Sequence, residues 1–153
     1  MDNKNKFDIK NLLLNLFIAE GAGFLSGILS GNISQKYSEM IKPKFAPPGI
    51  LFPIVWAILF FLMGIANYLS RSNKKASYLY FIQLIFNFLW SIFFFGLDLK
   101  LFSFFWLIIL FVLILATTKE FFKTNFYSGL LMIPYIIWVM FALYLNFEFW
   151  RLN

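Results

Sequence analysis

The chain has 153 residues, of which 61% are hydrophobic and 13% are charged, and its formal net charge is +6. This composition excludes an ordinary water-soluble domain and indicates an integral membrane protein. The absence of cysteine and histidine excludes disulfides, thiolate nucleophiles, imidazole bases and the usual zinc, copper and haem ligands. We therefore expect no metal site and no resident cofactor. The basic residues lie singly or in pairs between apolar runs, so we interpret them as topology charges and expect no nucleic-acid partner.

Five apolar segments are long enough to cross a bilayer core of about 30 Å as helices. They are longer than barrel strands and lack the alternation that a barrel requires. The sequence therefore predicts an all-α integral membrane fold, a bundle of five transmembrane helices that forms a single domain over residues 1–153. The predicted helices cover about residues 12–31, 50–70, 77–96, 101–122 and 126–149.

The distribution of Lys and Arg predicts the orientation of the bundle. Eight of the thirteen lie on the side that carries the N-terminus. By the positive-inside rule this side is cytoplasmic, in what we expect to be a bacterial cell membrane. The eight are Lys4, Lys6, Lys10, Arg71, Lys74, Lys75, Lys119 and Lys123.

The first predicted helix carries a glycine face and one carboxylate. Gly23, Gly27 and Gly31 recur every four residues, which allows another helix to approach closely, either within the protomer or as a homodimer seam. Glu20 would cost about 2.5 to 3.5 kcal/mol at a helix centre, so we expect it to face the bundle interior or to be protonated. It is either a functional residue or an incidental acid. It also argues against a cleavable signal peptide ending near Gly21.

The first connection leads into the second helix through the segment KPKFAPPGILFPIVW, Lys42–Trp56. Its prolines, Pro47 among them, restrict the backbone, so Phe45 and Trp56 should be held at fixed positions near one mouth of the bundle. A rigid aromatic rim suits a flat apolar ligand, and Lys42 would attract an anionic one.

Two later helices carry polar and aromatic residues on one face. Gln83, Asn87 and Trp90 share a stripe of the third helix, which either binds neighbouring helices or lines a ligand cavity. In the fifth helix, Pro134 should produce a kink and open space beside Trp138, which lies too deep for an interfacial anchor.

Three ordered segments resemble the TspO/MBR family of tryptophan-rich sensory proteins. They are KPKFAPPGILFPIVWAILFFLMGIANYL, QLIFNFLWSIFFFG and IPYIIWVMFALYLNFEFWRLN. The resemblance implies a five-helix membrane bundle, often dimeric, with a pocket under the first connection for porphyrins such as protoporphyrin IX and for benzodiazepine-type ligands. By position, the pocket residues would be Tyr37, Trp56, Asn87, Trp90, Trp138 and Ala142.

Two positions depart from the family pattern. Phe45 stands where a tryptophan is usual, so the ring is kept without its N–H donor. Phe147 stands where the animal sterol motif has tyrosine, so sterol binding is unsupported.

Three functions are compatible with these patterns. The first is a tetrapyrrole-binding receptor or transporter-like protein with Phe45 and Pro47 at the rim of its pocket. The second is a light-dependent enzyme that degrades porphyrin through Trp56 and Trp138, since conventional acid–base residues are missing. The third is a membrane scaffold that acts through its glycine face. In each case membrane lipid and a second copy of the chain are the expected partners.

Overall fold

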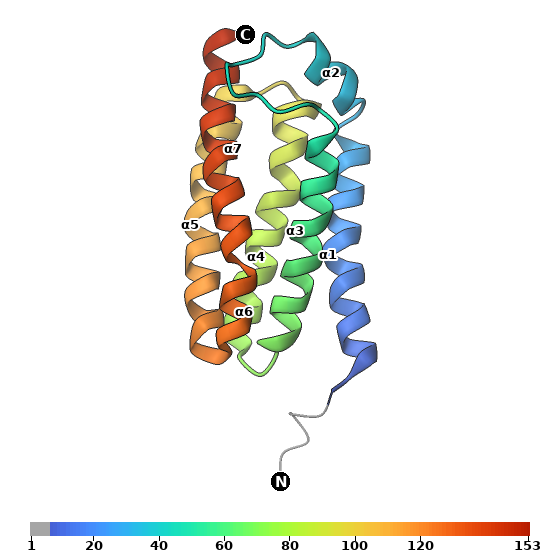
Figure 1. Ribbon diagram of the computed structural model, residues 1–153, viewed down its shortest axis with the longest axis vertical. Helices are drawn as coiled ribbons and strands as arrows, with labels where there is room; N and C mark the ends of the chain where they lie inside the picture. Colours follow the sequence, from blue (N-terminus) through green and yellow to red (C-terminus); the bar gives the residue numbers. More distant parts are fainter. Residues whose placement is uncertain (1–6) are drawn as a thin grey trace.

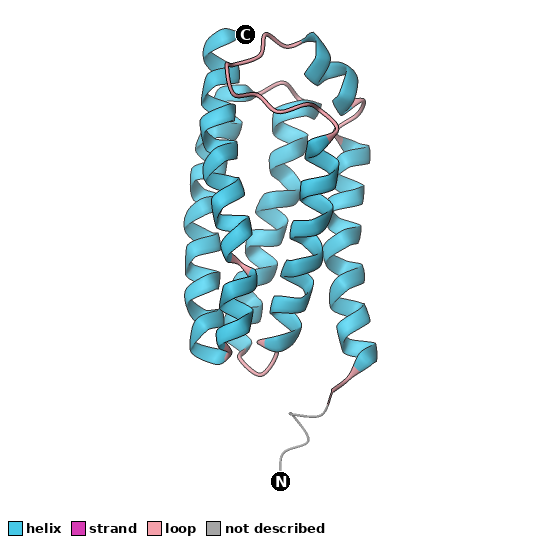
Figure 2. Cartoon of the chain, viewed as in Figure 1, coloured by secondary structure: helices cyan, strands magenta, loops and turns pink. Residues whose placement is uncertain are grey.

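A computed structural model of the protein describes residues 7–153, so Lys4 and Lys6 lie outside the described residues. Within this range the chain is helical, and no strand occurs (Figure 2). The five long helices lie side by side. The first begins at one end of the bundle, and the last ends at the opposite end (Figure 1).

Five of the helices or helix pairs are long and apolar enough to cross a membrane, which confirms the predicted all-α membrane bundle. The fifth column consists of two consecutive helices, α6 and α7, and the third ends in a π-helix, η2. The elements are α1 (Ile9–Leu29), α2 (Ile33–Glu39), α3 (Leu51–Leu69), α4 (Lys74–Ser91), η2 (Ile92–Gly96), α5 (Lys100–Thr124), α6 (Phe126–Leu131) and α7 (Ile133–Leu152).

The fifth column is interrupted near the proline that the sequence singled out. Pro134 lies in the first turn of α7, where its missing N–H requires no partner. The chain turns at Met132, whose N–H donates to Gly129 O at 3.1 Å, and this break separates α6 from α7. The proline thus begins a new helix at a break, where the sequence had predicted a kink within one continuous helix.

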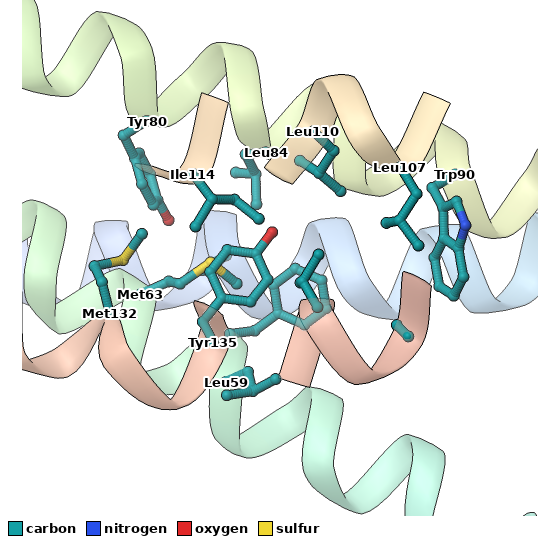
Figure 3. Close-up of a cluster of buried hydrophobic side chains, with 14 of the residues drawn as sticks. Leu59, Met63, Tyr80, Leu84, Trp90, Leu107, Leu110, Ile114, Met132 and Tyr135 are labelled. Carbon is teal, nitrogen blue, oxygen red and sulfur yellow. The ribbon is translucent and has the colours of Figure 1, made fainter. Parts of the chain in front are cut away.

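The centre of the bundle is filled by apolar side chains from several helices. Met63, Leu107, Leu110 and Tyr135 are fully buried there (Figure 3). On the outer surface, by contrast, large apolar side chains are exposed, for example Phe17 at 77%. An apolar exterior around a packed interior is what a lipid environment requires.

The helices α1 and α3 approach each other closely at one end. A Cβ atom on Gly64 would lie 3.2 Å from Asn15 O and 3.2 Å from the Leu16 Cα atom. At mid-height, a Cβ on Gly23 would collide with the Phe60 ring. Further along α1, a Cβ on Gly27 would meet no atom within 4 Å. The two helices are therefore in tight contact on the N-terminal side of Gly23 in α1, and they leave open space on its C-terminal side.

Replacing Gly64 with leucine is expected to destabilise the fold by about 1 to 3 kcal/mol, because the new side chain would push against the α1 backbone. The measurement is the free energy of unfolding in mixed detergent micelles. Gly21→Leu is the control, since a Cβ there meets nothing within 4 Å. Equal stability of the two variants would contradict the close approach.

Candidate ligand-binding site

A cavity of about 700 Å³ lies where α1 and α3 separate. Its walls come from α1, α3, α4 and η2, and α2 with the following connection covers one end. In Figure 1, α2 lies across the same end of the bundle as the C-terminus. The lining contains no residue from α5, α6 or α7. The cavity is therefore displaced from the bundle axis toward α1.

The cavity opens on the lipid-facing side of the bundle. Three of its lining residues are large apolar side chains that are mostly exposed: Phe24 at 71%, Ile28 at 58% and Ile50 at 67%. The first two belong to α1, and Ile50 immediately precedes α3. A ligand dissolved in the bilayer can therefore reach the cavity between these two helices.

The cover is held in place by two residues of α2. The Lys36 ammonium donates to Phe95 O at 2.5 Å and to Ser30 O at 3.3 Å, which joins α2 to η2 and to the end of α1. A cation suits these helix C-termini, whose carbonyls carry partial negative charge. The Tyr37 hydroxyl donates to Pro47 O. Burial raises the pKa of Tyr37, which further favours the protonated hydroxyl that donates this bond.

The first connection is also fixed just after α2, by Asn153 at the end of α7. Ile41 N donates to the Asn153 side-chain oxygen at 2.8 Å, and the Asn153 amide donates back to Ile41 O at 3.1 Å. The connection is thus anchored at α2 and at the end of α7. This pairing makes it an ordered cover.

Two tryptophans form an aromatic wall of the cavity. The Trp56 and Trp90 ring centroids are 5.9 Å apart, and Trp56 also lies 6.2 Å from Tyr135. Trp90 is buried and donates its indole N–H to Asn146 at 3.0 Å, which fixes its orientation (Figure 3 shows it at the edge of the core). The Trp56 indole N–H has no hydrogen-bond partner among the described residues and is not fully buried, so it can donate to a ligand.

A buried hydrogen-bond chain supports the same wall. The Tyr135 hydroxyl donates to Gln83 Oε1 at 2.9 Å and accepts from Asn87 Nδ2 at 2.6 Å. Because the single hydroxyl proton is used toward Gln83, Asn87 must present its amide group to Tyr135. Its Oδ1 atom then has no partner among the described residues and is available on the cavity side.

The structure brings some of the predicted site residues together and separates others. Tyr37, Trp56, Asn87 and Trp90 line the cavity, as do the glycines Gly23, Gly27 and Gly31. Four predicted site residues do not line it: Phe45, Pro47, Trp138 and Ala142.

Each of these four has an identifiable position. Phe45 is 65% exposed at the surface of the connection, and Pro47 contributes only its carbonyl to Tyr37. Ala142 is buried in the core. Trp138 contacts Phe52 with their ring centroids 6.1 Å apart, and Phe52 in turn lines the cavity. Phe52 therefore lies between Trp138 and the open space.

Phe52 and Phe60, which belong to none of the predicted site residues, line the cavity on either side of Trp56. Their spacing of four residues from Trp56 places all three on one face of α3. That periodicity could have identified them. It is hidden in this chain because phenylalanine occurs 23 times.

The fold and the site define a class of protein: a small five-helix membrane bundle with an aromatic cavity beneath its first connection. The sequence profile of the TspO/MBR family matches residues 15–151, and the chain belongs to this family.

Several relatives align over most of the chain. A tryptophan-rich protein TspO of Chlorobaculum tepidum is 39% identical over 92% of this chain and 97% of its own length. The protein CrtK of Rhodobacter capsulatus is 36% identical over 76% of this chain and 78% of its own. The human translocator protein is 30% identical over 84% of this chain and 80% of its own.

Proposed function

We propose that this protein is a membrane receptor or transporter-like protein that binds a flat aromatic ligand, a tetrapyrrole such as protoporphyrin IX, in the cavity between α1 and α3. The observation that carries the proposal is the pair of tryptophan rings, Trp56 and Trp90, on one cavity wall beneath the cover formed by α2. Extended π-systems pack favourably on such rings.

The size and chemistry of the cavity support this ligand class. Its volume of about 700 Å³ lies within the range of about 300 to 1,000 Å³ that is typical of small-molecule sites. Most of the lining is apolar, and the polar groups without a partner among the described residues are few: the Trp56 N–H, Asn87 Oδ1, the Ser34 hydroxyl and the Glu20 carboxyl group. Lys42 lies with its ammonium 5.3 Å from the Tyr37 ring at the covered end, where it would attract ligand carboxylates.

Replacing Trp56 with alanine is expected to weaken protoporphyrin IX binding at least tenfold, because a wall of the cavity is lost. Binding is measured through the porphyrin absorption band with the protein in lipid nanodiscs. Trp150→Ala is the matched control, since Trp150 is 41% exposed at the end of α7 and does not line the cavity. Unsaturable binding that is equal in wild type and both variants would show partitioning into lipid and defeat the proposal.

A second candidate is light-dependent degradation of the bound porphyrin. It is favoured by the chain of oxidisable rings that leads from the cavity through Trp56 to Trp90 and Tyr135. Illumination of the complex distinguishes the two functions. If the protein is only a receptor, the absorbance of bound porphyrin falls under light no faster than that of free porphyrin. An enzyme accelerates its loss, and Trp56→Phe slows that acceleration; Trp138, behind Phe52, is the second predicted participant.

Orientation and assembly complete the proposal. The charge distribution supports a cytoplasmic N-terminus, which places the cover formed by α2 on the opposite side of the membrane. The glycine face of Gly23, Gly27 and Gly31 is the proposed homodimer seam, and because these glycines also line the cavity, a partner would contact the protomer beside the opening of the cavity.

A further inference from the structure

Glu20 lies on the cavity wall in the middle of a transmembrane helix. It is the twelfth residue of the 21-residue α1, and it shares a helix face with Gly23 and Gly27, three and seven residues further on. The cavity thus extends from Tyr37 at its covered end to Glu20 in its deeper part. A carboxyl group at this depth is costly unless another group compensates it.

The protein itself supplies no such group. Among the described residues, the Glu20 carboxylate forms no hydrogen bond and no ion pair. The lining of the cavity contains no lysine or arginine. The other described carboxylates in transmembrane helices are paired: Glu120 with Lys75 and Lys123, and Glu148 with Arg151. Glu20 is therefore the described transmembrane carboxylate that has no counter-charge within the protein, and when it is ionised only a group from outside the chain can compensate it.

Other groups on the cavity wall also favour a positively charged ligand. Asn87 is 96% buried and lines the cavity, and the Tyr135 hydroxyl bond leaves its carbonyl oxygen unpaired. The rings of Trp56 and Trp90 present π-faces, which attract organic cations by roughly 0.5 to 2 kcal/mol each. Carboxylate, carbonyl oxygen and indole faces all carry negative potential, so each of them favours a cation over an anion within the cavity.

The entrance of the cavity restricts the ligand further. It opens between Phe24, Ile28 and Ile50, which are exposed and apolar, so a ligand arrives from the lipid phase. A small hydrated cation would lose its water shell on this route, whereas an aromatic cation with delocalised charge loses little.

We propose that the cavity binds lipophilic aromatic cations, and that Glu20 is the residue that selects them by pairing with their charge. The inference rests on the proposed function in that both use the same cavity. It adds a second ligand class, which is distinguished from neutral aromatic molecules by charge and not by shape.

The test uses two probes of nearly the same shape, the permanent cation 10-methylacridinium and the neutral 9-methylanthracene. Their binding to the full chain in nanodiscs is measured against empty nanodiscs. Wild type should bind the cation at least tenfold more tightly than the neutral probe. Glu20→Gln should remove this preference by weakening cation binding at least tenfold, while neutral binding changes less than twofold. Glu20→Asp should retain part of the preference.

Glu148→Gln is the matched control, because Glu148 is also a carboxylate of a transmembrane helix but pairs with Arg151 and lies outside the cavity lining. Its preference for the cation should equal that of wild type. A wild-type protein that does not prefer the cation overturns the proposal even if no variant folds, and so does an unchanged preference in Glu20→Gln. Protoporphyrin IX binding is measured in parallel: if it persists while the cation preference is missing, the further inference fails and the proposed function stands.

Discussion

Replacing Gly27 with leucine is expected to lower the affinity for protoporphyrin IX at least tenfold without unfolding the protein. Gly27 lines the cavity, and a Cβ atom built on it meets nothing within 4 Å, so the new side chain would occupy the ligand's space and not displace protein atoms. Ligand affinity in nanodiscs and the free energy of unfolding are measured together. The expected result is a large change in the first and a small change in the second.

Gly21→Leu is the control for this prediction. A Cβ on Gly21 also meets nothing within 4 Å, but Gly21 lines a separate apolar groove between α1 and α4. This variant should bind porphyrin as wild type does. If Gly27→Leu instead retains porphyrin binding and loses a dimer detected by light scattering, the glycine face is an assembly surface and the scaffold function is favoured.

Replacing Tyr135 with phenylalanine is expected to destabilise the protein by about 1 to 3 kcal/mol and also to weaken ligand binding. The change removes one hydroxyl group and leaves two buried amides, those of Gln83 and Asn87, without the partner that orients them. Asn87 lines the cavity, so a change in its side-chain orientation would weaken its contact with the ligand. The measurements are unfolding in mixed micelles and a porphyrin titration.

Tyr144→Phe provides the matched control, because Tyr144 lies on the same helix, is 38% exposed, and its hydroxyl forms no hydrogen bond among the described residues. Its stability should stay within about 0.5 kcal/mol of wild type, as is usual at exposed positions. If Tyr135→Phe and Tyr144→Phe lower the free energy of unfolding by the same amount, the hydrogen bonds of Tyr135 do not stabilise the fold specifically.

The transmembrane helices could be predicted from the sequence because burial in lipid requires long apolar runs with internal hydrogen bonding. The short helix α2 could not, since its sequence, ISQKYSE, is mostly polar and carries no membrane signal. It is stabilised by tertiary contacts instead, above all by Lys36 on the carbonyls of η2 and α1. The π-helix η2 likewise has no pattern that distinguishes it from an ordinary helix end.

The candidate site could be predicted in part. Asn87 and Trp90 share a helix face that must look inward, because an amide in lipid needs partners, and both line the cavity. Periodicity could not tell which helices separate to form the space. The cavity lies between α1 and α3, so Trp138 on α7 contacts Phe52 and not the cavity itself. The position of the cavity depends on where Gly23 and Gly64 allow α1 and α3 to approach each other closely, and this can be seen only in the assembled bundle.

The location of the binding site can be determined from an experimental structure of the protein saturated with protoporphyrin IX. We expect ligand density between α1 and α3 beneath α2, with the macrocycle against Trp56 and Trp90 and no ligand in the groove between α1 and α4. Density confined to that outer groove, or to the lipid around an empty cavity, would contradict this expectation.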